Sequence, residues 1–552
     1  MTFPSPLRYL RTLPPGDRLI MSILGGLVIC ALIVALYGFQ LRFLIEQPAY
    51  GGSFTEGVVG TPRFVNPLLA ISDTDRDLAA LTFAGLMGHD ANGVLVPVLA
   101  ESYEISPDGK TYTFILRQNA KFSDNTSVTA SDVVFTVSKA QDPALRSPAL
   151  ANWANIRAEA VDARTVRFTL PKAYAPFLED TTLGILPAHI WKDVTNAEFP
   201  FSSRQINPVG AGPFEVSNMS RKGDGSISSY ELTAFKGYAI GRPYLSSIRF
   251  VFFSDQSELN DAVRRGEVQS AYGVASGRAI KVPYSRVFGV FFNPSEEPVF
   301  ADISVRKALS VAINRQAIVN ESFGGYATAI AGPLPPRATV TAIPLPSVDT
   351  RVADARQILS DGKWKYDEAS QRWSKGDTTL AVTLTTSNVP ELKAVATQVQ
   401  EDWQALGVPV SIELHDAGAL TQEVIRPRAY GALLFGEVIG RTPDLFAFWS
   451  SSERTNPGLN IADYSDKEVD ALLEKIRQEK TPDPTDLATL NMLIANDYPA
   501  AFTHTPDFVY TIPSGLHGVH ITEVAAPSDR FDDAAHWYRN TELVWPIFAK
   551  SK

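Results

Sequence analysis

Cysteine is almost absent from this chain, because its 552 residues include one, Cys30, which lies within a long apolar run. The rest of the chain therefore has no intrachain disulfide and depends on core packing for stability. A single thiol also excludes thiolate metal clusters. A lipoprotein signal carries Gly, Ala or Ser directly before its modified cysteine, whereas Ile29 stands there in this chain. Cys30 is thus interpreted as a small apolar membrane residue rather than a lipid attachment site.

The motifs of common catalytic sites are also missing. We find no Gly-x-Ser-x-Gly turn, no His-Glu-x-x-His helix, no Gly-x-x-x-x-Gly-Lys loop and no dinucleotide-binding fingerprint. His517 and His520 are three residues apart, but Gly515 and Gly518 favour a loop or strand there, so both are interpreted as surface histidines. The acidic pairs at 73/75 and 532/533 are interpreted as solvated loop residues. We therefore predict no enzymatic activity, no cofactor and no metal site.

Excess positive charge is absent as well. The chain has 50 Lys and Arg against 60 Asp and Glu and a pI near 5.4, so the basic stripe of a nucleic-acid-binding protein is not predicted. Hydrophobic residues make up 45% of the chain, which is enough for large cores. A length prior of about 150 residues per domain predicts two to four structural units.

The longest apolar run covers residues 19–41 and contains no charged side chain. A helix of that length measures about 34 Å, enough to cross a hydrocarbon core of about 30 Å. Arg8, Arg11 and Arg18 precede the run and Arg42 follows it, so the positive-inside rule places residues 1–18 in the cytoplasm and the bulk of the chain outside. A cleaved signal has a shorter apolar core and a small-residue cleavage site. We predict an uncleaved transmembrane anchor at 19–41 and a linker at 42–50.

The first half of the exported part is rich in strand patterns. Residues 102–116 contain a strand, a Ser-Pro-Asp-Gly turn at 106–109 and a second strand in which Tyr112, Phe114 and Leu116 occupy alternate positions, which predicts a hairpin. The same alternation predicts strands at 166–170 and 248–252.

The second half alternates strands with helices. Strands are predicted at 380–384 and 408–414, joined by a helix that Pro390 opens and Gly407 ends, which makes one βαβ unit. Further helices are predicted from Asp302 to Gly324 and from Ser465, which is expected to be the N-cap, through 476. An α/β fold follows, and ligands of open α/β sheets bind at the carboxyl ends of strands.

Nine stretches carry a resemblance to one family. They are FVNPLL (64–69), PVLAES (97–102), DGKTYTFILR (108–117), KFSDNTSVTASDVV (121–134), GAGPF (210–214), RRGEV (264–268), VRKALSVAINRQAIV (305–319), PDLFAFW (443–449) and YSDKEVDALL (464–473). In these stretches, which occur in the family's order, the chain resembles the extracytoplasmic solute-binding proteins of family 5. These are the peptide and nickel ABC transporter substrate-binding proteins of the dipeptide- and oligopeptide-binding type, also called cluster C.

The resemblance implies a type II periplasmic-binding-protein fold with two lobes and a twice-crossed hinge. Lobe I would comprise residues 51–283 and 506–552, with a subdomain inserted at about 68–200, and lobe II would comprise residues 284–505. A monomer would capture an oligopeptide by hinge closure and deliver it to the permease of an ABC importer. The peptide main chain would be held by strand-like hydrogen bonds, and its side chains would occupy hydrated pockets.

The resemblance also implies where the ligand would be held. The lobe I segment and one weaker candidate are Glu56, Gly57, Val58, Val59 and Thr61, with Tyr272. The lobe II segment is the end of a strand at 430–435 and its exit, with Phe435, Gly436, Glu437, Val438, Ile439, Gly440, Arg441 and Asp444.

The chain departs from the family at one position. Peptide-binding members hold the α-ammonium of the ligand with an aspartate just after the lobe II strand, where this chain has Gly440 or Arg441. Either Glu437 or Asp444 supplies the anion instead, or the ligand is not held by a free amino terminus. Our hypothesis is that Glu437 points into the cleft and pairs with the ligand or with Arg441. Asn125 replaces the glycine of the family's Lys-Phe-x-Asp-Gly turn, and asparagine tolerates a positive φ there.

Other functions stay open at this point. The same scaffold in other family members binds nickel complexes, oligosaccharides or opines. An anchored extracytoplasmic hydrolase that uses acidic cleft residues is a second class, and a surface sensor or chaperone is a third.

Overall fold

The computed structural model describes residues 14–336, 342–479 and 482–548. It divides into two compact units, one formed by Met1–Gly52 with Tyr538–Lys552 and the other by Ser53–Trp537. Arg8 and Arg11, which carry part of the orientation argument, lie outside the described residues.

The smaller unit contains the predicted apolar helix, α2 (Pro15–Phe43). Its stretch Pro15–Phe39 has a mean hydropathy of 2.9 and is long and apolar enough to cross a membrane. Large apolar side chains along it are exposed, for example Leu24 and Leu32. Length and composition alone fit a membrane anchor and a signal sequence equally well.

The segment predicted as a linker contains a strand instead. β1 (Ile45–Ala49) pairs in antiparallel register with β23 (Asn540–Val544), so that Ile45 is opposite Val544. The partner strand comes from the far end of the chain, and the local composition of residues 42–50 carries no sign of it. Only the tertiary structure brings the two edges together.

The larger unit is built on a twelve-stranded sheet with the order β20-β19-β21-β14-β22-β12-β2-β11-β10-β9, in which β13 and β15 also pair with β22. The strands are β2 (Ser53–Val59), β9 (Phe214–Arg221), β10 (Ile227–Ala234), β11 (Ser247–Phe253), β12 (Ser270–Tyr272), β13 (Ala279–Pro283), β14 (Arg286–Phe292), β15 (Ala327–Ala329), β19 (Val382–Ser387), β20 (Val410–His415), β21 (Ala432–Val438) and β22 (Ala500–Thr511).

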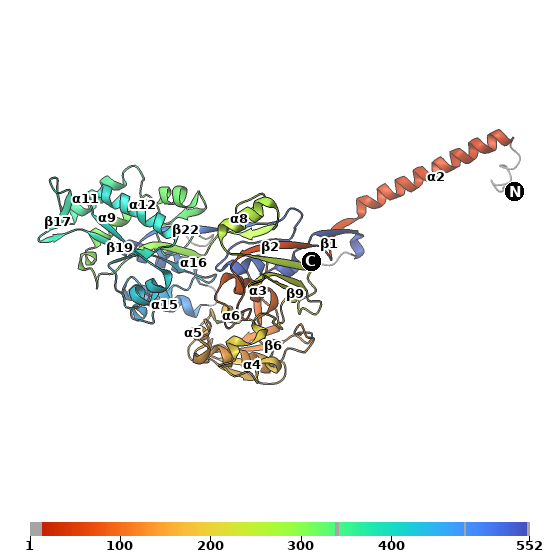
Figure 1. The fold of residues 1–552 in the computed structure, drawn as a ribbon, viewed down its shortest axis with the longest axis horizontal. Helices are drawn as coiled ribbons and strands as arrows, with labels where there is room; N and C mark the ends of the chain where they lie inside the picture. The colour runs from red at the N-terminus through yellow and green to blue at the C-terminus, as the bar shows by residue number, and fades with distance from the viewer. Residues whose placement is uncertain (1–13, 337–341, 480–481, 549–552) are drawn as a thin grey trace. The chain divides into compact units, whose positions relative to one another are not determined.

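The long strand β22 belongs to both halves of this sheet. Its first half pairs with β14 up to His504, and its second half pairs with β13 from Asp507 onward. The chain passes between the halves a second time where β13 leads into β14. Figure 1 shows α9, α11, α12 and β19 gathered on one side of the unit and β2, β9, α3 and α8 on the other. Two lobes therefore share two adjacent chain crossings, as a hinged binding protein requires.

Separate hydrophobic cores support the two lobes. The first lobe packs around Phe54, Tyr230 and Phe250, which are at most 2% exposed. The second lobe has one core around Phe292 and Trp403 and another that contains Trp449 and Phe502. Among the described residues, only Tyr284 at the lobe boundary belongs to the core of the other lobe, so relative motion of the lobes would leave the cores largely intact.

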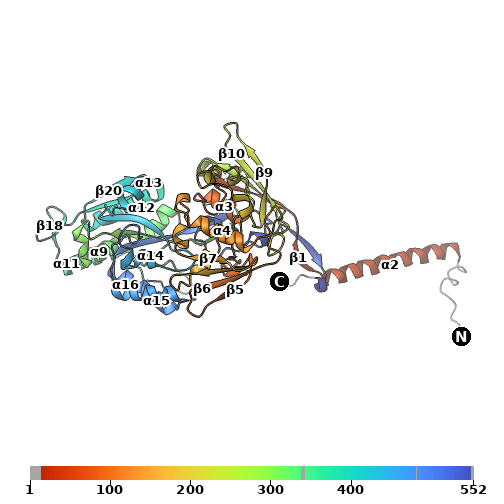
Figure 2. The same ribbon diagram turned by 90° about the horizontal axis from the view of Figure 1, so that it is seen from below.

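A subdomain with its own core is inserted in the first lobe. Its four-stranded sheet has the order β5-β6-β8-β7, from β5 (Ala100–Ile105), β6 (Thr111–Leu116), β7 (Arg157–Ala160) and β8 (Thr165–Thr169). α4 (Ala130–Ala140) packs on this sheet (Figure 2) and begins with a capping box in which Asp132 accepts from the N–H of Thr129. The predicted hairpin is confirmed in β5 and β6. In the separate turn that follows β6, Asn125 has the positive φ that was expected, 69°.

The predicted βαβ unit is confirmed as β19, α12 (Pro390–Leu406) and β20, with the two strands parallel. Pro390 lies in the first turn, and Gly407 ends the helix with a φ of 97°. Trp403 is fully buried and donates its indole N–H to the carbonyl of Leu309 at 2.8 Å. The 3.6-residue period of buried side chains thus identified the face that covers the sheet.

Two predicted helix boundaries differ from the structure. α9 (Ile303–Ala312) begins after Asp302 as predicted but does not continue to Gly324, because Ile313 is extended. Arg315 follows, and its buried guanidinium donates to the carbonyls of Ser310 and Phe502, so a long-range contact interrupts the helix. α15 (Lys467–Gln478) is capped by Asp466 rather than by Ser465.

The unit also contains α-helices and β-strands that have not yet been named. They are α3 (Asp73–Thr82), α5 (Leu150–Trp153), α6 (Phe177–Asp180), α7 (Ala188–Trp191), α8 (Gln256–Arg265), α10 (Arg315–Ala317), α11 (Arg351–Asp361), α13 (Ala417–Ala419), α14 (Phe446–Trp449), α16 (Pro484–Asp497), β3 (Met87–His89), β4 (Leu95–Pro97), β16 (Lys365–Asp367), β17 (Arg372–Lys375) and β18 (Thr378–Thr379).

Candidate ligand-binding site

A cavity of about 330 Å³ lies at the carboxyl end of β2. Its lining includes five of the residues predicted from the sequence, Gly57, Val58, Val59, Thr61 and Tyr272. The rest of the wall is formed by Gly60, by residues of α3 and its N-cap, by residues of α8 and by Arg530. A Cβ on Gly57 would lie 2.5 Å from Leu259 Cδ1, so this glycine lets β2 approach α8 closely.

Glu56 differs from its neighbours because it is fully buried and faces away from this cavity wall. Its carboxylate accepts from the guanidinium of Arg530 at 2.9 Å, from the Tyr510 hydroxyl at 2.9 Å and from the Ser270 hydroxyl. Asp77 binds the same guanidinium at 2.6 Å. Burial raises the pKa of Asp77 to about 6, against the opposing effect of the Arg530 charge. Glu56 is therefore part of an internal ion-pair network rather than a ligand contact.

The predicted lobe II segment alternates between the protein interior and the surface. Val438 is 49% exposed, whereas Glu437 and Ile439 are 3% and 4% exposed. A Cβ on Gly436 would lie 2.5 Å from the ring of Phe288, so this glycine makes room for an aromatic side chain. Gly440 has a φ of 77°, and its carbonyl accepts from the Ser285 hydroxyl at 2.7 Å. Phe435 is partly buried and packs against the core that contains Trp449.

Glu437 does not pair with Arg441, which corrects the hypothesis drawn from the sequence. Both carboxyl oxygens of Glu437 are buried and form no hydrogen bond with any described residue. Burial raises the pKa of Glu437 well above its ordinary value, and the nearby Trp449 indole opposes this only in part. Strand alternation explains the error, since side chains of residues 437 and 439 face the helices behind the sheet while 436 and 438 face the other way.

Arg441 pairs with carboxylates of the chain itself. Its guanidinium lies 3.3 Å from Asp529 and in direct contact with Asp532, and its side chain is 14% exposed. Both aspartates come from the C-terminal segment, in or just after the short turn Pro527–Phe531. The guanidinium that stands near the position of the family's ammonium-binding aspartate is thus already neutralised.

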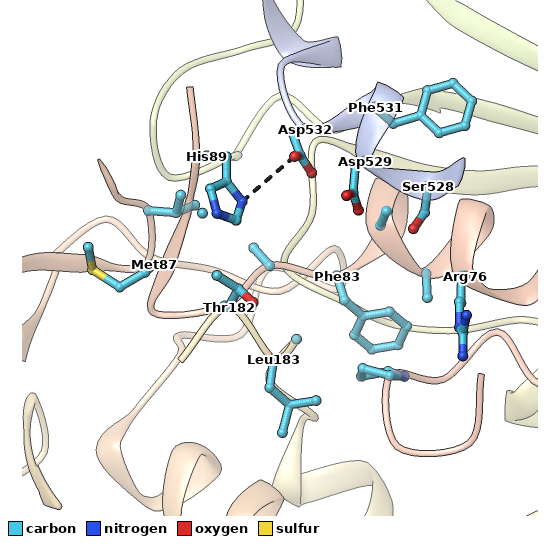
Figure 3. A pocket seen from close by; sticks show the side chains of 18 of the residues that line it. Arg76, Phe83, Met87, His89, Thr182, Leu183, Ser528, Asp529, Phe531 and Asp532 are labelled. Atoms are coloured by element: carbon cyan, nitrogen blue, oxygen red, sulfur yellow. Dashed lines mark ion pairs between the residues drawn. The ribbon is translucent and has the colours of Figure 1, made fainter. Parts of the chain in front are cut away.

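Two residues of the inserted subdomain extend this arrangement. His89 Nε2 lies 2.9 Å from Glu179, and His89 Nδ1 lies 3.7 Å from Asp532, as the dashed line in Figure 3 marks. We call His89, Glu179, Arg441, Asp529 and Asp532 the charge cluster. Burial raises the pKa of Asp532 to about 7, although the Arg441 charge opposes this. A cavity of about 430 Å³ adjoins the cluster, with Phe83, Leu183 and Ser528 in its wall (Figure 3).

Asp444 is paired as well. Its Oδ2 lies 3.1 Å from Arg477 Nε and 3.5 Å from the Tyr174 hydroxyl. The Arg477 guanidinium also lies over the rings of Phe446 and Tyr174, at 4.2 and 4.9 Å from their centroids. Asp444 therefore joins the lobe II exit to the inserted subdomain and has its charge compensated within the chain.

Reasoning from the sequence missed Tyr284 and Arg286, which link the two predicted segments. The Arg286 guanidinium lies 4.1 Å from the centroid of the Tyr284 ring, and Tyr284 meets Tyr272 edge to face with centroids 6.5 Å apart. Tyr272 in turn lines the cavity at the end of β2, and Arg286 is the register partner of Val438. Their position at the predicted lobe boundary was the one available sign.

Comparisons with known proteins agree on one family. The profile of the bacterial extracellular solute-binding proteins, family 5, middle region, matches residues 94–458. The glutathione-binding protein GsiB of Shigella dysenteriae is 28% identical over 496 residues, which cover 84% of this chain and 89% of that protein.

Two solved structures have the same fold. The ABC transporter substrate-binding protein CtaP of Listeria monocytogenes superposes with a TM-score of 0.73 at 25% identity and covers 89% of this chain and 99% of its own. The oligopeptide-binding protein AppA of Bacillus subtilis, in complex with a nonapeptide, superposes with a TM-score of 0.70 at 22% identity and covers 90% of this chain and 100% of its own. The chain belongs to the bacterial extracellular solute-binding proteins of family 5.

Proposed function

We propose that this chain is the membrane-anchored substrate-binding component of an ABC importer and that it captures short peptides between its lobes. The observation that carries the proposal is the cavity at the end of β2, whose wall contains Gly57, Val58, Val59, Thr61 and Tyr272. The names of similar proteins support the ligand class, since one is a glutathione-binding protein and another was solved with a nonapeptide.

The lobes are proposed to meet at residues 283/284 and 505/506, with the inserted subdomain at about 68–200. Support comes from β22, whose partner changes between His504 and Asp507, and from the passage of the chain from β13 to β14. A ligand that touches both lobes favours the closed form by its differential affinity for that form. Closure then removes the ligand from water before delivery.

The main chain of the peptide is proposed to be its principal handle. The backbone of residues 57–61 ends a strand at the cavity, and residues 436–440 end another. Hydrogen bonds to peptide main chain are common to all sequences, so a receptor of this kind accepts varied side chains. An ammonium anchor of the family's type is not part of the proposal, because Glu437 is buried and Asp444 is paired with Arg477.

Ligand capture is tested with the full-length chain purified in detergent. Native mass spectrometry is expected to show a co-purified small molecule, and calorimetry is expected to show micromolar or tighter binding of tripeptides or glutathione. Recovery of the ligand unchanged after prolonged incubation separates a receptor from a hydrolase. Absence of binding to di-, tri- and pentapeptides and to glutathione would overturn the peptide proposal.

A non-peptide solute is the second candidate. It is favoured because Glu437 is buried and Asp444 is paired with Arg477, so neither residue offers a carboxylate to a ligand ammonium. A nickel complex, an oligosaccharide or an opine is then the ligand class. Calorimetry with nickel–histidine, cellobiose and an opine under the same conditions distinguishes these from peptides.

A further inference from the structure

Arg286 stands out among the arginines around the predicted ligand segments. Arg441, Arg477 and Arg530 each contact one or two carboxylates of the chain. The Arg286 side chain forms no hydrogen bond or ion pair with any residue that the structure describes, and its Nε is buried without an acceptor. The residue is half-buried at the start of β14.

An uncompensated guanidinium in such a position is costly. Its contact with the Tyr284 ring at 4.1 Å stabilises the charge from one face. The contact leaves the buried Nε–H of the guanidinium without an acceptor, and buried donors are normally paired. A ligand anion that completes the pairing would thus recover a penalty which the unliganded chain carries.

The surroundings of Arg286 connect it to the proposed binding region. Tyr284 meets Tyr272, which lines the cavity at the end of β2. Across the ladder Arg286 is paired in register with Val438, whose exposed side chain belongs to the other predicted segment. Asp73 lines the same cavity but forms no ion pair with Arg286, so this carboxylate does not neutralise the guanidinium directly.

We propose that Arg286 binds a carboxylate of the ligand and that the chain selects solutes with a free carboxylate, such as a peptide C-terminus. Planar guanidinium groups bind carboxylates in a bidentate manner, which fixes the orientation of the ligand as well as its charge. This inference rests on the proposed function and adds the chemical class that the site distinguishes.

The test compares ligands with free and masked carboxylates on the full-length chain in detergent. The probes are trialanine, trialanine amide, N-acetyl-trialanine, glutathione and glutathione diethyl ester, measured by calorimetry. Masking the carboxylates is expected to weaken binding to the wild type by about tenfold to a hundredfold, the range of a charge-assisted pair. N-acetylation of trialanine is expected to weaken binding by less than about threefold, because the ammonium group of the free peptide contributes little to affinity.

Substitutions locate the effect. Arg286→Gln is expected to weaken the free-carboxylate probes by at least about tenfold and to remove the discrimination against the masked forms, whereas Arg286→Lys retains part of it. Arg249→Gln, an exposed arginine of β11, is the matched control and is expected to behave as the wild type. The comparison of free and masked probes on the wild type needs no variant, so it tests the requirement for a free carboxylate even if Arg286→Gln does not fold.

The outcomes distinguish failure of the proposed role of Arg286 from failure of the proposed peptide capture. Equal binding of free and masked peptides by the wild type would overturn the role of Arg286 and leave peptide capture intact. Retained discrimination in a folded Arg286→Gln protein would have the same meaning. Failure of every probe to bind the wild type would overturn the proposed function and this inference with it.

Discussion

Glu437 shows how one side chain can reverse a sequence-based expectation. The charged residue nearest the expected ammonium site lies at an inward position of β21, among the side chains that pack on α14. Its carboxyl has no hydrogen-bonding partner among the described residues, so it costs free energy of folding when it ionises.

Glu437→Gln is expected to stabilise the protein at neutral pH and to leave peptide affinity unchanged. In the folded protein, burial raises the pKa of Glu437 well above 4.5, the ordinary value of a glutamate in the unfolded chain. The wild type therefore loses stability as pH rises from that value toward the folded pKa, and the uncharged glutamine does not. The melting temperature of the variant should exceed that of the wild type by about 2 °C at pH 8 and match it near pH 4. A weakened peptide affinity with intact folding would restore the ligand-binding hypothesis for Glu437.

The ion pairs of Arg530 are expected to be the most sensitive electrostatic feature of the first lobe. Arg530 and its partners Glu56 and Asp77 are all at most 2% exposed. Arg530→Met would leave two buried carboxylates without a cation and is expected to destabilise the protein by about 3–5 kcal/mol.

Chemical denaturation of Arg530→Met measures the effect. Arg264→Met, an exposed arginine at the end of α8, is the control and should change stability by less than about 0.5 kcal/mol. A loss of less than about 1 kcal/mol for Arg530→Met would show that the three buried side chains relax to reach water.

Among the elements, the exit of β21 is held by groups from distant parts of the chain. Arg441 contacts the C-terminal segment, and Asp444 contacts Arg477 and, from the inserted subdomain, Tyr174. These contacts occur where closing lobes would meet, so the charge cluster is expected to stabilise the closed form without touching the ligand.

Arg441→Ala is expected to weaken ligand affinity by about tenfold and to increase the fraction of open molecules. Removal of the cation breaks the ion pairs that join the exit of β21 to Asp529 and Asp532 of the C-terminal segment, so the closed form loses this stabilisation. Small-angle scattering of the liganded protein measures the opening, and Arg441→Lys should recover part of the affinity. Lower affinity without any change in scattering would show instead that Arg441 contacts the ligand.

Elements that are set by residues close together in sequence were predicted correctly, whereas elements that depend on residues far apart in sequence were not. The βαβ unit, the hairpin of β5 and β6 and the start of α9 depend on local periodicity, caps and turns, and were predicted correctly. The early end of α9 and the strand β1 depend on Arg315 and β23, whose partners lie far away in sequence. Patterns within a short window contain no information about such partners.

For the molecule as a whole, the apolar helix α2 determines whether the receptor is tethered or released. An uncleaved helix of this length would keep the binding lobes near the membrane and raise their local concentration beside a permease. A cleaved signal would instead leave a soluble protein beginning after the apolar run.

The intact mass of the protein isolated from membranes is expected to include residues 1–43. The protein should also remain in the membrane fraction after carbonate and high-salt washes, since a spanning helix inserts irreversibly. A mass that begins beyond residue 41, with the protein in the soluble fraction, would contradict the anchor. Substitution of Leu27 and Leu32 by Arg is a control that should release the full-length chain from the membrane.

The amino-acid sequence by itself determined the family, the α/β class, the apolar anchor candidate and the segment at residues 57–61 that lines a cavity. These features depend on local pattern and motif order. Only the tertiary structure decided which charges are compensated, with Glu56, Arg441 and Asp444 paired inside the chain and Arg286 without an ion pair among the described residues. The physical reason is that pairing of two charges depends on the distance between them, which only the fold sets. In addition, neighbouring residues of a strand face opposite sides of the sheet, so a shift of one residue moves a side chain from the ligand-binding face to the core.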